Sequence, residues 1–249
     1  MKIVEYGKEN QEVILLLHGG GLSWWNYRKE AQLLCDHYHV VLPVLDGHAD
    51  SEEDFISIEQ AAKHVISLIN DRFDGAVLML GGLSLGAQVV IEMLSQRKDI
   101  CRFAIIESAS VIPDQLTNAL LSPSISASFG LIQKKWFAKM QFQYLRIADD
   151  LFDEYYRDTS LITKENMISF LKASTTYQIK PTLKECNADI RIVIGGKEQK
   201  SIRSSASILK QTLPNSTLEI KEGLYHGEYS INHPDVYVAD LLKKIIARG

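Results

Sequence analysis

Short apolar runs recur along the chain and alternate with longer segments in which apolar residues follow the spacing of a helix. The runs have the length of a β-strand. Four of them, the first and the third to fifth, are apolar at nearly every position, which is typical of parallel strands covered on both faces. The six runs are VILLL (13–17), HVVLPVL (39–45), AVLMLGG (76–82), RFAIIES (102–108), IRIVIGG (190–196) and TLEIKEG (217–223).

Amphipathic segments between these runs predict helices. One of them opens with Ser57 and has Gln60 three residues later, which is the spacing of a capping box at a helix N-terminus. Alternating strands and helices predict an α/β fold with a doubly wound, mostly parallel sheet and right-handed crossovers. The predicted helices span residues 26–37, 57–72, 85–97, 201–213 and 234–248.

The alternation stops after the fourth run and resumes at the fifth. The intervening part contains no strong strand pattern and reads mostly as helix, at 132–158 and 163–177, with a Ser/Gly-rich loop at 122–130. It is either a plain helical subdomain or a mobile lid over a site. We therefore expect a core made of residues 1–108 and 188–249, with residues 109–187 as a helical insertion between two of its strands.

Composition narrows the class of protein. The chain has 249 residues, of which 46% are hydrophobic, which is enough for a large core, and its net charge of -4 argues against a nucleic-acid-binding face. Cys35, Cys101 and Cys186 are too far apart for a metal motif or a disulfide framework. No signal-peptide pattern opens the chain, and its first apolar run is too short to span a membrane. We expect a cytoplasmic protein with reduced thiols and neither a nucleic-acid nor a membrane partner; the oligomeric state is left open.

The third apolar run ends in GLSLG (82–86), with Ser84 at its centre. This stretch matches the G-x-S-x-G pattern, in which a strand turns sharply into a helix and exposes a serine nucleophile. Glycines two residues before and after the serine allow the strand and the helix to approach closely. A structural turn serine is the alternative, but the apolar strand before and the amphipathic helix after favour a nucleophile.

A serine hydroxyl needs a base to accept its proton. Among the seven histidines, His226 lies in a loop between the last predicted strand and the last helix, late in the chain, as expected for a base that follows the serine and the acid. The alternative for His226 is a surface loop residue. His18 and His48 lie in glycine-flanked loops and are expected to brace those loops through hydrogen bonds.

The loop HGGGL (18–22) follows the first predicted strand. Consecutive glycines let backbone N–H groups come close to a ligand, which is what an oxyanion hole requires. Gly20 is the expected first donor, and Leu85, the residue after the serine, the second. A merely flexible loop is the alternative interpretation of the glycines.

These pieces together resemble the α/β-hydrolase superfamily, and in particular its small carboxylesterases with a helical cap. The resemblance covers nearly the whole chain, through LLLHGGGLSWWNY, LDGHADS, LGGLSLGA, IVIGGKE and YHGEYSINHPD. It implies that Ser84 is the nucleophile, His226 the base, and Gly20 with Leu85 the oxyanion hole. It also implies that the insertion is the cap domain and that His48 is structural.

The resemblance leaves two candidates for the acid of the triad. The family usually has Asp in the loop after the strand that matches IVIGG, and Glu198 occupies that position here. Some members carry the acid one strand earlier, where this chain has Glu107. We favour Glu198 because it matches the usual position.

The expected activity is cleavage of a small carboxylic ester by a serine hydrolase through an acyl-enzyme. The alternatives are a C–C bond hydrolase or lyase on the same scaffold, or a non-catalytic small-molecule receptor. No metal or nucleotide motif is present, so no cofactor is expected. The loops contain no cluster of Lys or Arg, which favours a neutral or weakly polar ester. Trp24, Trp136 and Phe142 are the candidate substrate contacts, although aromatic residues at helical spacing are more often core.

Overall fold

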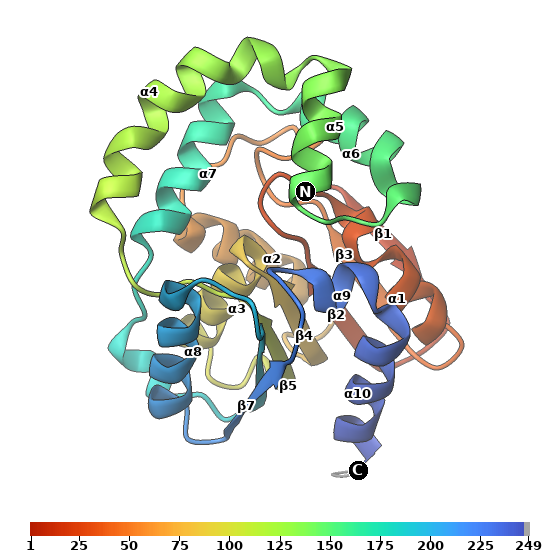
Figure 1. Cartoon of the computed structure of the whole chain (residues 1–249). Coiled ribbons are helices and arrows are strands. Elements are labelled where there is room, and N and C mark those ends of the chain that lie inside the picture. The colour runs from red at the N-terminus through yellow and green to blue at the C-terminus, as the bar shows by residue number, and fades with distance from the viewer. Residues whose placement is uncertain (247–249) are drawn as a thin grey trace.

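The computed structural model describes residues 1–246, and seven strands in it form one sheet in the order β1-β3-β2-β4-β5-β6-β7 (Figure 1). All neighbouring strands are parallel except β1, which pairs antiparallel with β3 at one edge. The mostly parallel α/β sheet predicted from the sequence is confirmed. The strands are β1 (Ile3–Tyr6), β2 (Val13–Leu17), β3 (His39–Pro43), β4 (Val77–Leu83), β5 (Cys101–Glu107), β6 (Asp189–Gly195) and β7 (Ser216–Lys221).

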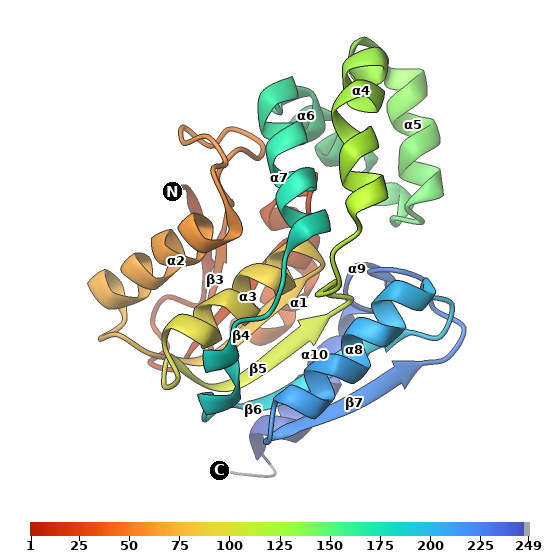
Figure 2. The ribbon, with the colours of Figure 1, turned by 90° about the vertical axis from the view of Figure 1, so that its left-hand side faces the viewer.

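Helices cover both faces of the sheet, as Figures 1 and 2 show from two sides. Helices α2, α3 and α8 bury their apolar faces in one core cluster, and α1 and α10 bury theirs in a second cluster on the opposite face. The double cover explains why the central strands are apolar at almost every position. These helices are α1 (Arg28–Leu34), α2 (Ile58–Arg72), α3 (Leu85–Gln96), α8 (Lys200–Thr212) and α10 (Pro234–Ile246), with a short α9 (Glu228–Asn232) before the last.

The sequence pattern did not identify β1 or α9. β1 is a four-residue edge strand whose residues are all half-buried, so it has no apolar run to mark it. Helix α9 has only five residues and begins after Gly227 in the left-handed conformation. Such short elements are specified by their neighbours more than by their own periodicity.

Four helices lie between β5 and β6, above the carboxyl ends of the strands (Figures 1 and 2). We call these helices, with the segments that join them, the cap. They are α4 (Gln115–Ile132), α5 (Lys135–Tyr144), α6 (Phe152–Leu161) and α7 (Lys164–Thr176). The structure thus has helices over the region in which the sequence predicted an insertion, while the exact bounds of 109–187 stay a prediction.

The predicted Ser/Gly loop at 122–130 is wrong, because this segment belongs to α4. The carboxylate of Asp114 accepts a hydrogen bond from Thr117 N (2.9 Å) and caps the helix. Within the helix, the Ser128 hydroxyl donates to the Ser124 carbonyl (2.9 Å), so a serine-rich sequence satisfies its polar groups locally. The predicted helix 132–158 is likewise interrupted, by a bend between α5 and α6.

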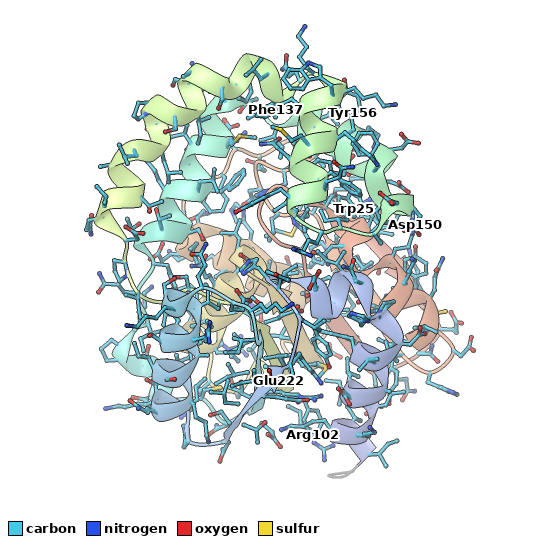
Figure 3. All side chains as sticks on the ribbon, viewed as in Figure 1. Trp25, Arg102, Phe137, Asp150, Tyr156 and Glu222 are labelled. Carbon is cyan, nitrogen blue, oxygen red and sulfur yellow. The ribbon has the colours of Figure 1, made fainter. Side chains whose placement is uncertain are left out.

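Hydrogen bonds join the cap to the core. Gln88 of α3 donates from Nε2 to the carbonyl of Ser110 (2.7 Å), on the connection into the cap, and to that of Ser174 (2.9 Å), in the last turn of α7. Trp25, beneath the cap in Figure 3, donates from Nε1 to Asp158 Oδ2 of α6 (2.9 Å). The cap is therefore attached at both of its ends and along α6.

None of the helices within residues 1–246 combines the length and the apolar character needed to cross a membrane. Cys35, Cys101 and Cys186 are free thiols, two of them buried, in agreement with the sequence-based expectation of unpaired cysteines.

Candidate active site

Ser84 lies at the sharp bend between β4 and α3. Its backbone has φ 52° and ψ −110°, a conformation that non-glycine residues rarely adopt and that stores strain. The bend is held because Ser84 N donates to the carbonyl of Glu107 on the neighbouring strand (2.9 Å). The serine is thus fixed at the carboxyl end of the sheet, where open α/β sheets place their ligands.

Two glycines make this bend possible. A Cβ at Gly86 would lie 2.2 Å from the Leu17 carbonyl oxygen and 2.5 Å from that of His18, so α3 passes directly over the end of β2. A Cβ at Gly82 would lie 2.5 Å from the Gly86 backbone. The spacing that singled out Ser84 in the sequence therefore reflects close packing of the strand against the helix.

Ser84 and His226 line one cavity of about 150 Å³, which we call the inner cavity. Its walls come from the glycine loop after β2, the bend at Ser84, the segment between α5 and α6, and the start of α9. The lining residues are Gly19, Gly20, Leu22, Leu83, Ser84, Leu145, Ile147, His226, Gly227 and Ile231. Apart from Ser84 and His226, every lining side chain is apolar or a glycine.

The two predicted oxyanion donors lie close together, and Gly20 lines this cavity. A Cβ at Gly20 would lie 3.6 Å from the Leu85 Cβ, so the glycine loop faces the first turn of α3. Leu85 is the first residue of α3, where a backbone N–H has no acceptor within the helix. The two segments can therefore present backbone donors to one oxygen atom.

His18 braces the glycine loop, as the sequence predicted. Its Nδ1 lies 2.9 Å from the Gly19 carbonyl, and its Nε2 accepts a hydrogen bond from Leu45 N (3.0 Å). Complete burial lowers the pKa of His18 to about 4, so the ring is neutral at physiological pH. His48 has a similar role, with its Nδ1 2.9 Å from the Asp46 carbonyl.

His226 contacts Glu198, one of the two candidate acids. Its Nδ1 lies 3.0 Å from Glu198 Oε2, and Ser108 Oγ donates to the other carboxylate oxygen at 2.5 Å. Burial favours the protonated form of Glu198, but the hydrogen bonds and charge of His226 and the hydroxyl of Ser108 outweigh it and lower the pKa. Burial likewise disfavours the cation of His226, but the hydrogen bond and charge of Glu198 raise the pKa of the imidazole.

Glu107, the rival acid, lies nearby but makes other contacts. Its Oε1 accepts a hydrogen bond from Ser230 N of α9 (3.2 Å), and its Oε2 is buried without a hydrogen-bond partner. Burial raises the pKa of Glu107 to about 7. The side chain thus supports the helix that follows His226, and its charge contributes to the raised pKa of that histidine.

The three aromatic residues predicted as substrate contacts line neither this cavity nor the one described next. Trp24 begins a short 3-10 helix (Trp24–Tyr27) and is partly buried in the core. Trp136 is 63% exposed on α5, whereas Phe142 is fully buried against Phe152 and Tyr155. Phe142 therefore lies on the buried face of α5, and Trp136 lies on its exposed face.

A second, larger cavity of about 490 Å³ also has His226 in its wall, and we call it the outer cavity. His226 and Leu145 border both cavities. Of its lining residues the sequence pointed only to Glu198 and His226, and no motif marked the others. The lining residues are Gln143, Tyr144, Leu145, Arg146, Lys197, Glu198, Gln199, Ile202, Tyr225 and His226.

Across the described part of the chain, no three His, Cys, Asp or Glu side chains are grouped so that they could hold a metal ion. The polar groups that converge at the two cavities are a serine, an imidazole, a buried carboxylate and backbone amides. That set is suited to nucleophilic and proton-transfer chemistry.

A family model for the alpha/beta hydrolase family matches residues 14–239. The chain belongs to this family. The match extends from β2 into α10 and so includes every element that contributes to the two cavities. A comparison with curated protein sequences gives no match.

Solved structures of esterases and of a lactonase superimpose on nearly the whole chain. A thermophilic esterase from Thermogutta terrifontis has a TM-score of 0.79 at 15% identity, over 99% of this chain and 93% of its own. An esterase from Exiguobacterium antarcticum has a TM-score of 0.81 at 15% identity, with 98% and 94% covered. An enol-lactonase from Burkholderia xenovorans has a TM-score of 0.77 at 14% identity, with 98% and 96% covered. At these identities the likeness establishes the fold.

Proposed function

We propose that this alpha/beta hydrolase is a serine hydrolase that cleaves a small carboxylic ester through an acyl-enzyme on Ser84. The observation that carries the proposal is the constellation at the inner cavity. A strained serine shares that cavity with a histidine whose other ring nitrogen lies 3.0 Å from a buried carboxylate. The esterases and the lactonase among the structural neighbours support an acyl-transfer reaction.

In the proposed first half-reaction, Ser84 Oγ attacks the ester carbonyl while His226 Nε2 accepts the hydroxyl proton. Glu198 accepts the Nδ1–H of His226, which holds the imidazole in the tautomer with a free Nε2 and stabilises the cation that forms. His226 then donates the proton to the leaving-group oxygen as the C–O bond breaks. The alcohol leaves and the acyl group stays on Ser84.

In the second half-reaction, His226 takes a proton from a water molecule that attacks the acyl carbonyl. The tetrahedral intermediate collapses, the proton returns to Ser84 Oγ, and the carboxylic acid is released. In both halves the negative oxygen is stabilised by the N–H groups of Gly20 and Leu85, whose segments face each other at the cavity.

The size of the inner cavity supports a small acyl group. About 150 Å³ bounded by apolar residues such as Leu22, Ile147 and Ile231 suits a short aliphatic chain. A larger acyl group would have to displace the segment between α5 and α6. We therefore propose that acyl-length preference is set by this part of the cap rather than by Trp24, Trp136 or Phe142.

Covalent labelling tests the proposal. A fluorophosphonate probe should modify the intact protein at Ser84, and p-nitrophenyl esters of increasing acyl length should be hydrolysed fastest at the shortest lengths. Ser84→Ala should lose labelling and several orders of magnitude in kcat while keeping the circular dichroism spectrum of the wild type. Labelling that persists in Ser84→Ala would contradict the assignment. Ligand binding without turnover would instead indicate a receptor, and C–C cleavage without a trappable acyl-enzyme would indicate the lyase-type alternative.

A further inference from the structure

Two cationic side chains, Arg146 and Lys197, line the outer cavity and lie against the ring of Tyr225. The guanidinium carbon of Arg146 lies 3.8 Å from the centroid of this ring, and Lys197 Nζ lies 5.0 Å from it. Both contacts are within the range of cation–π attraction, which holds the two charges beside the residue that precedes His226. Arg146 is further fixed by its backbone, because its carbonyl accepts a hydrogen bond from Asn232 Nδ2 (2.7 Å).

No carboxylate neutralises this pair. Within residues 1–246 neither Arg146 nor Lys197 takes part in an ion pair, whereas most other arginines do. Glu198 is the only acidic residue that lines the outer cavity, and its two oxygens are occupied by Ser108 and His226 with the side chain 1% exposed. In a protein of net charge -4, a cavity with two unneutralised cations is a specific attractor for an anion.

The position of this cavity relative to the proposed chemistry identifies what would occupy it. His226 and Leu145 line both the outer cavity and the inner cavity, which contains Ser84, so the two cavities adjoin at these residues. Because the histidine gives its proton to the leaving-group oxygen, the leaving group must lie on the His226 side of the scissile bond. The acyl chain then fills the inner cavity and the leaving group extends into the outer one.

We propose that the outer cavity binds an alcohol or phenol leaving group that carries a carboxylate, and that Arg146 and Lys197 hold this carboxylate. This inference rests on the proposed hydrolase function and names its substrate class. Arg146 offers a planar fork suited to a carboxylate, and Lys197 adds a point charge beside the same Tyr225 ring. The sequence did not reveal the pair, because the two residues are far apart in the chain and only the fold brings them to one ring.

Paired substrates test the inference. The anionic ester 4-acetoxybenzoate and its neutral isostere 4-acetoxybenzamide have the same acyl group and nearly the same shape. We define the anion preference as the ratio of their kcat/KM values, each divided by the rate of hydroxide-catalysed hydrolysis of that ester. The wild type should prefer the anion by about tenfold or more, and added salt should weaken this preference because the cavity is open to solvent.

Two variants and a matched control locate the effect. Arg146→Gln and Lys197→Gln should each lower the anion preference severalfold, with Arg146→Gln the larger, because kcat/KM should fall more for the anionic ester than for the neutral amide. Lys172→Gln removes the same charge from α7, where the residue is exposed and lines neither cavity, and should leave the preference unchanged. Because the two positions lie on different segments, misfolding of one variant leaves the other as a valid test.

The outcomes are distinguishable. An anion preference of one in the wild type, or one that survives both substitutions, overturns the inference and leaves the proposed function standing if Ser84 is labelled and the amide ester is hydrolysed. A clear preference for 4-acetoxyphenyl phosphate over 4-acetoxybenzoate overturns the carboxylate assignment. Absence of both labelling and turnover of either ester overturns the proposed function together with the inference.

Discussion

Helix α3 belongs to the core and helix α4 to the cap, and the two are built in opposite ways. Helix α3, beneath the serine, buries ten of its twelve residues. Helix α4, in the cap above, buries two of its eighteen, Ile125 and Ile132, and leaves leucines such as Leu116 and Leu120 exposed. A change in α3 must therefore be accommodated by the sheet and its neighbours, whereas most positions of α4 are exposed and can change with little effect on packing.

The site draws on both kinds of region. The bend at Ser84 and the Glu198–His226 pair belong to the densely packed core. Leu145, Arg146 and Ile147 belong to the bend between α5 and α6 in the cap. In the proposed reaction the core provides the chemistry and the cap provides the fit to substrate, so the two functions lie on segments with very different tolerance to substitution.

The largest effect is expected from the core side of the site. Glu198→Gln keeps the size of the side chain but removes the charge that orients and stabilises the His226 cation, so kcat should fall by about a hundredfold to ten-thousandfold. Steady-state kinetics on a short-chain ester measures this, with circular dichroism to verify the fold.

Glu107→Gln is the matched control for this loss. Glu107 contacts Ser230 N and not His226, so its replacement should lower kcat by less than about tenfold. If Glu107→Gln lowers kcat more than Glu198→Gln does, Glu107 and not Glu198 is the acid of the triad.

The second test concerns the tightest packing in the core. Gly86→Ala places a methyl group 2.2 Å from the Leu17 carbonyl oxygen, where backbone cannot yield as a side chain does. The free energy of unfolding should fall by about 3 kcal/mol or more. Urea denaturation followed by circular dichroism measures this, and a loss below about 1 kcal/mol would show that α3 is less constrained than its burial indicates.

The core was predictable from sequence because its signals are local and redundant. Runs that are apolar at nearly every position predict strands covered on both faces. A G-x-S-x-G motif between a strand and a helix predicts a sharp bend at the serine. Ser84 was singled out by this motif, His226 by its loop late in the chain, and Glu198 through the resemblance to the family; their roles stay a prediction. Parallel register then brings the strand ends together, with Leu83 opposite Glu107 and Glu107 opposite Val193.

The cap was predicted less well, for a physical reason. Helix α4 buries so few residues that its sequence has no strong periodic pattern, and its serines suggested a loop. The aromatic residues of α5 were proposed as substrate contacts, yet Phe142 packs inside the cap and Trp136 faces solvent. Arg146 and Lys197 meet only through the fold, so no local pattern could have paired them.

The buried carboxyl group of Glu107 should make the free energy of unfolding depend on pH. Burial raises the pKa of Glu107 from 4.5 to about 7, so the folded state retains a proton that the unfolded state has lost at intermediate pH. Stability from this group is therefore present below about pH 4.5 and is lost as the pH rises through 7, by up to about 3 kcal/mol.

Glu107→Gln removes this titration. Relative to the wild type, the variant should gain stability between pH 5 and pH 8, which denaturation at both values measures. Groups that do not interact with Glu107 cancel in the difference, whereas Glu30 and His226 contribute through their coupling to it, because the charge of Glu107 raises the pKa of both. An equal difference at the two pH values would contradict the raised pKa.

On the cap side of the site, the expected effect is on selectivity. Leu145 borders both cavities, so Leu145→Ala should enlarge the space near Ser84 and raise kcat/KM for longer acyl esters relative to acetyl by about 1–3 kcal/mol, or roughly tenfold to a hundredfold. Trp136→Ala, on the exposed face of α5, is the control and should leave the ratio unchanged. If only Trp136→Ala shifts the ratio, substrate reaches the outer face of the cap.

The smallest effect is expected in α4, from the same substitution that should be severe in α3. Gly130 is helical, and a Cβ built on it meets no atom within 4 Å. Alanine there restricts the unfolded chain and favours helix without any clash, so Gly130→Ala should stabilise the protein by about 0.5–1 kcal/mol, with kcat unchanged. For a chain of this length that corresponds to a rise in Tm of about 1–4 °C, which scanning calorimetry resolves. If Gly86→Ala lowers and Gly130→Ala raises the free energy of unfolding, the same methyl group distinguishes the two helices. If Gly130→Ala lowers it, α4 is packed more closely than its exposure indicates.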